Sequence, residues 1–294
     1  MKKVILPLVA LMLSMVACQK ENEGVFTLTV EEYNTDAKLH LNDENFAVWD
    51  NGDEVQVNGT DYTVSVSGTT ATLTGVAEAS TYTAIYPAAW ATGNTTLNIP
   101  GMQTYRENNG IQIIDAPMYA YSDGNTLKFR NLGALLAVTV NNETGSDLNV
   151  VSIDVTAQGA SLCGSATISN YTSEEPAMSV SGHNTVTLFC NTTIAANGSK
   201  EFYISLPPAT YTSGMEIVAT NTEGKTFKKT TTKSAEIARN KIYTFNWTAT
   251  FLPVGALAGK FTVNADGKQV YFSQGNLYAK KTGDNWTWNF YDEQ

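Results

Sequence analysis

Short runs in which apolar and polar residues alternate recur along most of the chain. Residues 25–30 place apolar side chains between threonines, and residues 202–206 repeat the pattern far downstream. Because successive side chains of a β-strand point to opposite faces, each run predicts a strand with one buried face. The same alternation predicts further strands at residues 62–66, 82–86, 136–140, 186–190 and 215–217.

Turn-forming residues separate these runs. Asn51-Gly52, Glu223-Gly224 and several similar pairs accept positive φ or bond to their own backbone, so they predict tight turns. After residue 17, no stretch carries a sustained apolar stripe at helical spacing. Regularly spaced short strands are typical of sandwiches and barrels, and we therefore predict an all-β fold.

A polar, glycine-containing stretch at residues 141–147 lies between two apolar runs and predicts a domain boundary. It separates an N-terminal β-sandwich at 25–142 from a C-terminal β-sandwich at 143–250. Residues 251–294 are predicted to form a linker and a short β extension. That extension includes the alternating aromatic residues Trp286, Trp288 and Phe290, a pattern that normally faces a core. Two alternatives follow: this strand docks on a preceding domain, or the chain is a truncated longer protein.

The composition and net charge of the chain exclude some classes of binding partner. The 294 residues include 39 Thr, 14 Tyr and 11 Phe, which suits pleated surfaces. Acidic residues number 28 against 18 Lys and Arg, giving a net charge of −10. Nucleic acids and anionic lipid surfaces require clustered basic residues, and the sequence has no basic run. We therefore expect no nucleic-acid partner.

The first residues have the pattern of an export signal. Lys2 and Lys3 precede an apolar run at residues 4–17, which is shorter than the ~20 residues of a membrane span. The run ends at Cys18 in a pattern that resembles a bacterial lipobox. This resemblance implies removal of residues 1–17 and attachment of lipid, including palmitate, to Cys18. The polar residues 18–24 then form a tether, similar to signals that send lipoproteins to the outer face of the outer membrane.

The other cysteines, Cys163 and Cys190, fit no metal-binding spacing. Two interpretations stay open for them, a disulfide and two separate buried thiols, and we favour the second. Asp50, Asp53 and Glu54 are candidate calcium ligands, but their spacing lacks a complete calcium loop. We favour the interpretation in which Asn51-Gly52 forms a turn and Asp53 accepts hydrogen bonds from loop amides. We therefore expect no metal, and we expect no cofactor.

The order of several segments resembles the fimbrillin-like lipoproteins, which are subunits of the type V pili of gut and oral anaerobic bacteria. The likeness spans roughly residues 25–250. It is carried by Trp49-Asp50-Asn51-Gly52-Asp53, by residues 82–87, 97–103 and 129–140, and by residues 151–153, 202–208 and 237–245.

The resemblance implies two tandem transthyretin-like β-sandwiches and a surface location in fimbriae. It also implies proteolysis after a basic residue beyond the first strand, departure of that strand, and its replacement by a strand of another pilus subunit. Lys38 is the only basic residue between residue 30 and Trp49, although the family usually has Arg there. A solvated loop lysine is the alternative, and an uncut chain suits an anchor or accessory adhesin. Residues 269–278 are a candidate donor strand.

Two other classes of function are an enzyme and a glycan-binding protein. No nucleophile elbow, phosphate-binding loop or metalloprotease motif occurs, and His40 and His183 lie outside any motif, so we do not predict an enzyme. The alternative to a pilus role is a glycan-binding surface lipoprotein that stacks aromatic residues on host or bacterial sugars. Tyr119, Tyr121 and Trp90 are the candidates for that role, although the same residues suit a core.

Overall fold

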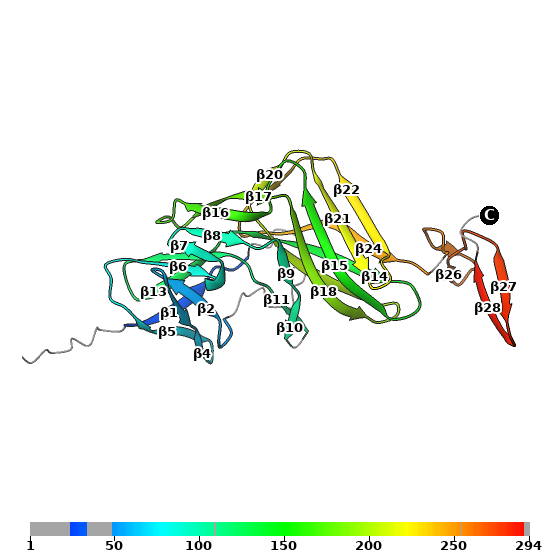
Figure 1. Cartoon of the computed structure of the whole chain (residues 1–294), viewed down its shortest axis with the longest axis horizontal. Coiled ribbons are helices and arrows are strands. Elements are labelled where there is room, and N and C mark those ends of the chain that lie inside the picture. Colours follow the sequence, from blue (N-terminus) through cyan, green and yellow to red (C-terminus); the bar gives the residue numbers. More distant parts are fainter. Residues whose placement is uncertain (1–23, 34–48, 109, 254, 291–294) are drawn as a thin grey trace, which may run out of the picture.

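The computed structural model describes residues 24–33, 49–108, 110–253 and 255–290, and Figure 1 shows that they form a β-protein. Apart from one turn of 3-10 helix, η1 (Ala88–Trp90), every element in these ranges is a strand. The prediction of an all-β chain is therefore confirmed, and the several packed sheets are those expected of β-sandwich domains. In this part of the chain, no helix has the length and apolarity needed to span a membrane.

An eight-stranded sheet in the order β3-β2-β6-β12-β13-β1-β5-β4 encloses one apolar core. Only Val64 separates β3 from β4, so the two ends of this order are consecutive parts of one bent strand. The sheet therefore closes on itself. Its strands are β1 (Gly24–Val30), β2 (Glu54–Val57), β3 (Thr60–Thr63), β4 (Ser65–Ser67), β5 (Thr70–Val76), β6 (Tyr82–Tyr86), β12 (Met118–Ser122) and β13 (Thr126–Asn131).

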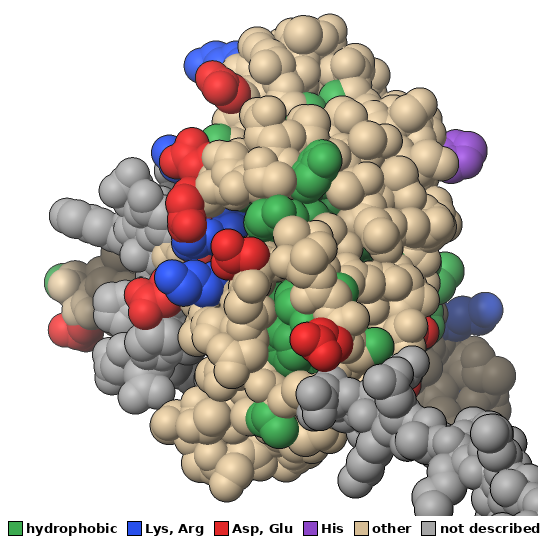
Figure 2. Space-filling view, turned by 90° about the vertical axis from the view of Figure 1, so that its left-hand side faces the viewer, with side chains coloured by type: hydrophobic (Ala, Val, Ile, Leu, Met, Phe, Trp, Pro, Cys, Tyr) green, Lys and Arg blue, Asp and Glu red, His purple; other side chains and the backbone are tan. Residues whose placement is uncertain are grey.

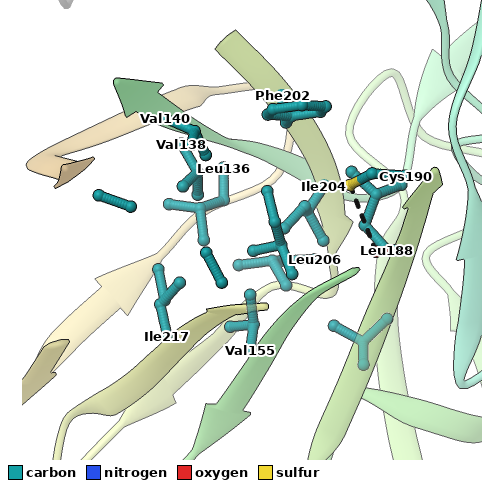
Figure 3. Close-up of a cluster of buried hydrophobic side chains, with 14 of the residues drawn as sticks. Leu136, Val138, Val140, Val155, Leu188, Cys190, Phe202, Ile204, Leu206 and Ile217 are labelled. Carbon is teal, nitrogen blue, oxygen red and sulfur yellow. Dashed lines mark hydrogen bonds between the residues drawn. The ribbon is translucent and has the colours of Figure 1, made fainter. Parts of the chain in front are cut away.

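A second core lies between a three-stranded sheet, β19-β14-β24, and a five-stranded sheet, β22-β21-β15-β18-β9. Figure 3 shows Leu136, Phe202 and Ile204 of the three-stranded sheet packed against Val155, Leu188 and neighbouring residues of the five-stranded sheet. The strands are β9 (Met102–Thr104), β14 (Ala134–Asn142), β15 (Leu148–Ala157), β18 (Thr185–Ile194), β19 (Ser199–Leu206), β21 (Met215–Asn221), β22 (Thr226–Thr231) and β24 (Ile242–Phe251).

A four-stranded sheet in the order β17-β16-β8-β7 packs against the outside of the closed eight-stranded sheet, which is called the first sheet below. It consists of β7 (Ala91–Gly93), β8 (Thr96–Ile99), β16 (Cys163–Ser169) and β17 (Ala177–His183). Ile85 of β6 and Tyr119 of β12 point outward from the first sheet into this contact. Both faces of β6 are therefore buried, with Tyr82, Ala84 and Tyr86 facing the closed core as their alternation predicted.

The predicted domain limits, 25–142 and 143–250, stay a prediction. β8 and β9 pair with β16 and β18, and β14 pairs with β19 and β24. Backbone pairing thus connects residues on both sides of residue 142. Two further small pairs, β10 (Arg106–Asn108) with β11 (Ile111–Ile113) and β20 (Ala209–Tyr211) with β23 (Ala235–Ile237), complete this part of the molecule.

The C-terminal extension consists of two short hairpins, which Figure 1 shows at one end of the molecule. They are β25 (Phe261–Thr262) with β26 (Gln269–Val270), and β27 (Leu277–Thr282) with β28 (Asn285–Phe290). The strand predicted around Trp286 is present, but Trp286 and Trp288 are 56% and 66% exposed. The alternative in which this strand docks on a preceding domain is therefore wrong for this structure, because β27 is the strand it pairs with. The candidate donor at residues 269–278 is split between β26 and β27 and is not one strand.

Candidate functional site

β1 is the first strand of the described residues, yet it lies inside the sheet and not at its edge. It runs parallel to β13, with Thr27 opposite Thr126, and antiparallel to β5, with Thr27 opposite Thr72. Both sides of its backbone therefore have a neighbouring strand. Figure 1 shows β1 in blue beside β5 and β13.

The side chains of β1 contribute to the closed core. Phe26 and Leu28 are 3% and 4% exposed, and the Phe26 ring meets the Tyr82 ring edge-on at 4.6 Å. The intervening Thr27 and Thr29 are exposed. Burying one such apolar side chain stabilises a fold by about 1.5–3 kcal/mol. The first strand is thus held by backbone pairing on two sides and by two buried anchors.

A polar network holds the chain where β1 ends. The backbone N–H of Glu31 donates to the carbonyl of Phe129 (2.9 Å), which extends the parallel pairing by one residue. The Glu31 carboxylate pairs with Arg239 and also accepts the backbone N–H of Asn131 at 3.0 Å. The Arg239 Nε donates to the Asn131 carbonyl at 2.8 Å. The Glu31 and Arg239 side chains are 17% and 19% exposed, so this ion pair is largely withdrawn from water.

Tyr33, two residues later, is buried on the opposite side of the three-stranded sheet from the second core. Its neighbours there are Ala116, Leu135, Ala137, Tyr203 and Ile242. The Tyr33 hydroxyl has no hydrogen-bond partner within the described ranges, and its burial raises the pKa of the phenol by disfavouring the phenolate. Residues 24–33 therefore contact the first sheet, the loop before β24 and the outer face of β14 and β19.

The predicted lipidation site Cys18 and the predicted cleavage site Lys38 lie outside the described residues, as does His40. The described chain resumes at Trp49, whose ring meets Tyr86 at 5.1 Å and Phe129 at 5.0 Å. Trp49 thus packs against the closed core as an apolar anchor.

The predicted turn after Trp49 is also confirmed. Gly52 has φ of 96°, and the Asp53 carboxylate accepts the backbone N–H of Asp50 at 2.9 Å. Desolvation raises the pKa of Asp53. Among the residues that the structure describes, no group of three or more His, Cys, Asp or Glu side chains is arranged to hold a metal ion.

Cys163 and Cys190 are separate buried thiols, as favoured above. Cys163 belongs to the contact between the four-stranded sheet and the first sheet, and Cys190 belongs to the second core. Figure 3 shows the Cys190 thiol directed at the Leu188 carbonyl, which accepts its hydrogen bond at 3.5 Å. Burial raises the pKa of Cys190 to about 12, so the reactive thiolate is disfavoured at neutral pH.

Of the three candidate sugar-stacking residues, only Tyr121 is exposed. Tyr119 is 1% exposed inside the contact beneath the four-stranded sheet, and Trp90 packs against the same cluster. Tyr121 is 37% exposed and lies 6.4 Å from the ring of Tyr171, which is 44% exposed. Tyr119 therefore follows the core alternative, because the four-stranded sheet covers β12 at that position and leaves Tyr121 exposed.

Sequence reasoning missed the pairing of Glu31 with Arg239. The two residues are 208 positions apart, and neither lies in a periodic pattern that would reveal a partner. Arg239 belongs to the segment at residues 237–245 that carries the family resemblance. The sequence could therefore have suggested a role for Arg239, but it could not have identified Glu31 as its partner. Figure 2 shows acidic and basic side chains side by side along one side of its face, which otherwise carries little charge.

No known sequence family matches the chain, and no curated protein matches it. Among solved structures, it is similar to a candidate cell adhesion protein from Bacteroides ovatus (TM-score 0.47, 15% identity, covering 85% of this chain and 94% of that one). A second such protein, from Bacteroides uniformis, has a TM-score of 0.45 and 16% identity over 79% of this chain and 93% of that one. The tip fimbrial protein Mfa3 from Porphyromonas gingivalis has a TM-score of 0.33 and 13% identity over 79% and 96%. All three TM-scores lie under 0.5, so these likenesses carry no functional argument.

Proposed function

We propose that this protein is a lipid-anchored cell-surface subunit, of fimbrial or related adhesive type, that assembles with other subunits by exchange of β1. The observation that supports this proposal most directly is the place of β1. It is the first strand of the described residues, but it fills an internal position of a closed sheet, between β13 and β5. Withdrawing β1 therefore opens the sheet at one position and leaves the other seven strands in register.

The vacated position would have a defined chemistry. The facing edges of β5 and β13 would present backbone N–H and C=O groups without partners, and each buried group left in that state costs about 1–3 kcal/mol. The space of Phe26 and Leu28 would present an apolar groove. A strand with the same alternation, entering parallel to β13, satisfies both requirements. The exchanged strand thus joins two subunits without new covalent chemistry, and we propose a non-enzymatic role.

The anchor and the release step complete the proposal. Lipid on Cys18 would hold the tether at residues 18–24 in the outer membrane, with the body exposed at the cell surface. Cleavage at Lys38 would free β1, Glu31 and Tyr33 together with the lipid on Cys18, so that a cut body would be held by its partner subunits. Without cleavage, the same chain would serve as the base or an accessory subunit of the assembly.

Cross-linking β1 in place tests strand exchange. We expect a chain that begins after Cys18, with a specific protease site inserted between Tyr33 and Trp49, to form multimers once it is cut. Cysteines at Thr27 and Thr72 face each other across an antiparallel pair, where Cα separations of about 4.5–5.5 Å suit a disulfide. The oxidised Thr27→Cys/Thr72→Cys variant should stay monomeric after cutting, as measured by native mass spectrometry.

Adding reductant to the same variant is the matched control and should restore multimers. Multimers that form equally well with the disulfide intact would contradict exchange of β1. A cut chain that stays monomeric with the disulfide either oxidised or reduced would contradict self-assembly. Assembly would then require a different surface subunit as the partner.

A second candidate function is glycan binding, which the exposed Tyr121–Tyr171 pair favours. Two adjacent exposed rings are the arrangement on which sugar faces stack. Glycan-array binding that is lost in Tyr121→Ala, from a chain that never multimerises, would favour this function over a pilus role.

A further inference from the structure

The contacts of Glu31 reach further than those needed to end a strand. Two residues of the body, Arg239 and Asn131, bond to Glu31, and a third, Asn240, bonds to Asn131. Arg239 and Asn240 lie in the turn between β23 and β24, whereas Asn131 ends β13. None of the three belongs to the segment at residues 24–33. Whatever strand occupies the β1 position, these three residues stay behind.

The arrangement of the three is fixed by their own bonds. The Asn131 side chain is fully buried, and its Nδ2 donates to the Glu31 carbonyl at 2.9 Å and to Asn240 Oδ1 at 2.8 Å. Asn240 has φ of 58°, and its backbone N–H donates to the carbonyl of Gly133 at 2.8 Å. The Arg239 guanidinium is tied to Asn131 through Nε. The body thus presents a guanidinium and a backbone N–H that meet at one oxygen of the Glu31 side chain.

The chemistry of this pair of donors selects an anion. A guanidinium keeps its proton at any pH that proteins tolerate, so Arg239 stays charged whether or not Glu31 is present. A cation that is only 19% exposed is costly without a counter-charge. An oxygen that accepts from both the guanidinium and the Asn131 N–H must carry negative charge to offset that cost. An amide oxygen of the same shape accepts the bonds but leaves the charge uncompensated.

We propose that Arg239 and Asn131 form a carboxylate-recognition site that selects the strand occupying the β1 position. The occupant is a partner subunit's strand with apolar residues at the positions of Phe26, Leu28 and Val30, followed at once by Glu or Asp. The alternation directs the apolar side chains inward, and the carboxylate fixes the register, because a slip of one residue would place it away from Arg239. This inference rests on the proposed function, since it requires that β1 can be replaced.

Peptide replacement tests the site. The full chain with a protease site between Tyr33 and Trp49 is cut, and its N-terminal fragment is displaced with an excess of labelled peptide of the sequence 24–33. Bound peptide is measured by native mass spectrometry and fluorescence anisotropy. We expect the Glu31→Gln peptide to bind at least about tenfold more weakly than the natural sequence. The matched control is the Glu32→Gln peptide, because Glu32 is the exposed neighbour, and it should bind within about twofold.

A second cut chain, carrying Arg239→Gln, tests whether Arg239 is the group that recognises the carboxylate of the peptide. In the Arg239→Gln chain, the natural and Glu31→Gln peptides should bind equally, because the cation that distinguishes them is gone. Equal binding of the natural and Glu31→Gln peptides to the unmodified acceptor would overturn the recognition site while leaving strand exchange intact. Failure of the natural peptide to enter would instead overturn strand exchange itself. The comparison of peptides on the unmodified acceptor holds even where the Arg239 variant does not fold.

Discussion

At the scale of single residues, Glu143 connects the body to the C-terminal extension. Its carboxylate lies 2.5 Å from Lys260 Nζ and accepts the hydroxyl of Tyr271. The hydrogen bond from Lys260 lowers the pKa of Glu143, and that from Tyr271 lowers it further. Burial, with the bond to Glu143, raises the pKa of Tyr271 to about 12. Both shifts favour the charged carboxylate with the neutral phenol at physiological pH.

Removing this charge should loosen the extension. Because the folded pKa of Glu143 lies below its ordinary value of 4.5, the contact contributes fully above that pH and is lost as the pH falls below it. Glu143→Gln should imitate the acid state at pH 7 and raise hydrogen exchange at residues 255–274 by up to about fivefold. Glu216→Gln, which removes a similar pair with Lys228 on β21 and β22, is the control and should leave those residues unchanged. Unaltered exchange in Glu143→Gln would show that other contacts hold the extension.

At the scale of elements, β19 is an edge strand whose outer backbone groups are satisfied by two glutamine side chains. Gln103 donates to the Ser205 carbonyl (2.7 Å) and accepts the Ser205 N–H (2.9 Å). Gln112 makes the same two bonds with Tyr203, at 2.8 and 2.9 Å. A primary amide has one acceptor and one donor in the arrangement of a peptide group, so each glutamine replaces one residue of a missing neighbouring strand. This edge is thereby closed to pairing with other chains.

Replacing these amides should destabilise the fold and open the edge. Gln103→Leu and Gln112→Leu each leave a backbone N–H and C=O without their partner, which should cost about 1–3 kcal/mol in denaturant unfolding. The double variant should also associate at high concentration in size-exclusion chromatography. Gln56→Leu, at a glutamine whose side chain bonds to the nearby Asp61 side chain and to no backbone group of a sheet edge, should change stability by less than about 0.5 kcal/mol. A double variant as stable and monomeric as the parent would contradict the role of the glutamines.

How far the sequence could predict these elements depends on the range of the contacts. Alternation at residues 26–30 and 202–206 identified strands and their buried faces, because a strand's own pleat determines that pattern. Which strands become neighbours depends on pairings such as Thr27 with Thr126, and these leave no local trace. The Gln103 and Arg239 contacts were equally out of reach, since a polar residue in a loop or strand signals no particular partner. Tyr119 shows a second limit, because alternation in a strand does not reveal that another sheet covers its outer face at one position and leaves Tyr121 exposed.

At the scale of the whole molecule, the apolar clusters end at Phe251. In the part of the chain that the structure describes, no residue beyond Phe251 belongs to any of the buried clusters. The hairpin of β27 and β28 is a two-stranded unit with exposed tryptophans, and such a unit has little stability of its own. Stability therefore resides in residues 24–251.

Deleting residues 277–294 should accordingly leave thermal unfolding of the body unchanged, with a shift in Tm of less than about 2 °C by calorimetry. Phe251→Ala, a truncation inside the second core, should instead cost about 3–5 kcal/mol. A deletion that lowers the Tm as much as Phe251→Ala would show that the hairpin supports the body after all.

The parallel pairing of β1 with β13 also determines the order in which the molecule becomes complete. Thr27 is synthesised long before its partner Thr126, so the first strand must wait while the intervening chain emerges. Closing a loop of that length is entropically costly, and contacts so distant in sequence form late in folding. The pairing of β1 with β13 is therefore among the last contacts of the closed sheet to form. Under the proposed exchange, a strand from a neighbouring molecule competes during that interval with the chain's own tethered first strand, and the local concentration of subunits would then determine whether monomers or assemblies form.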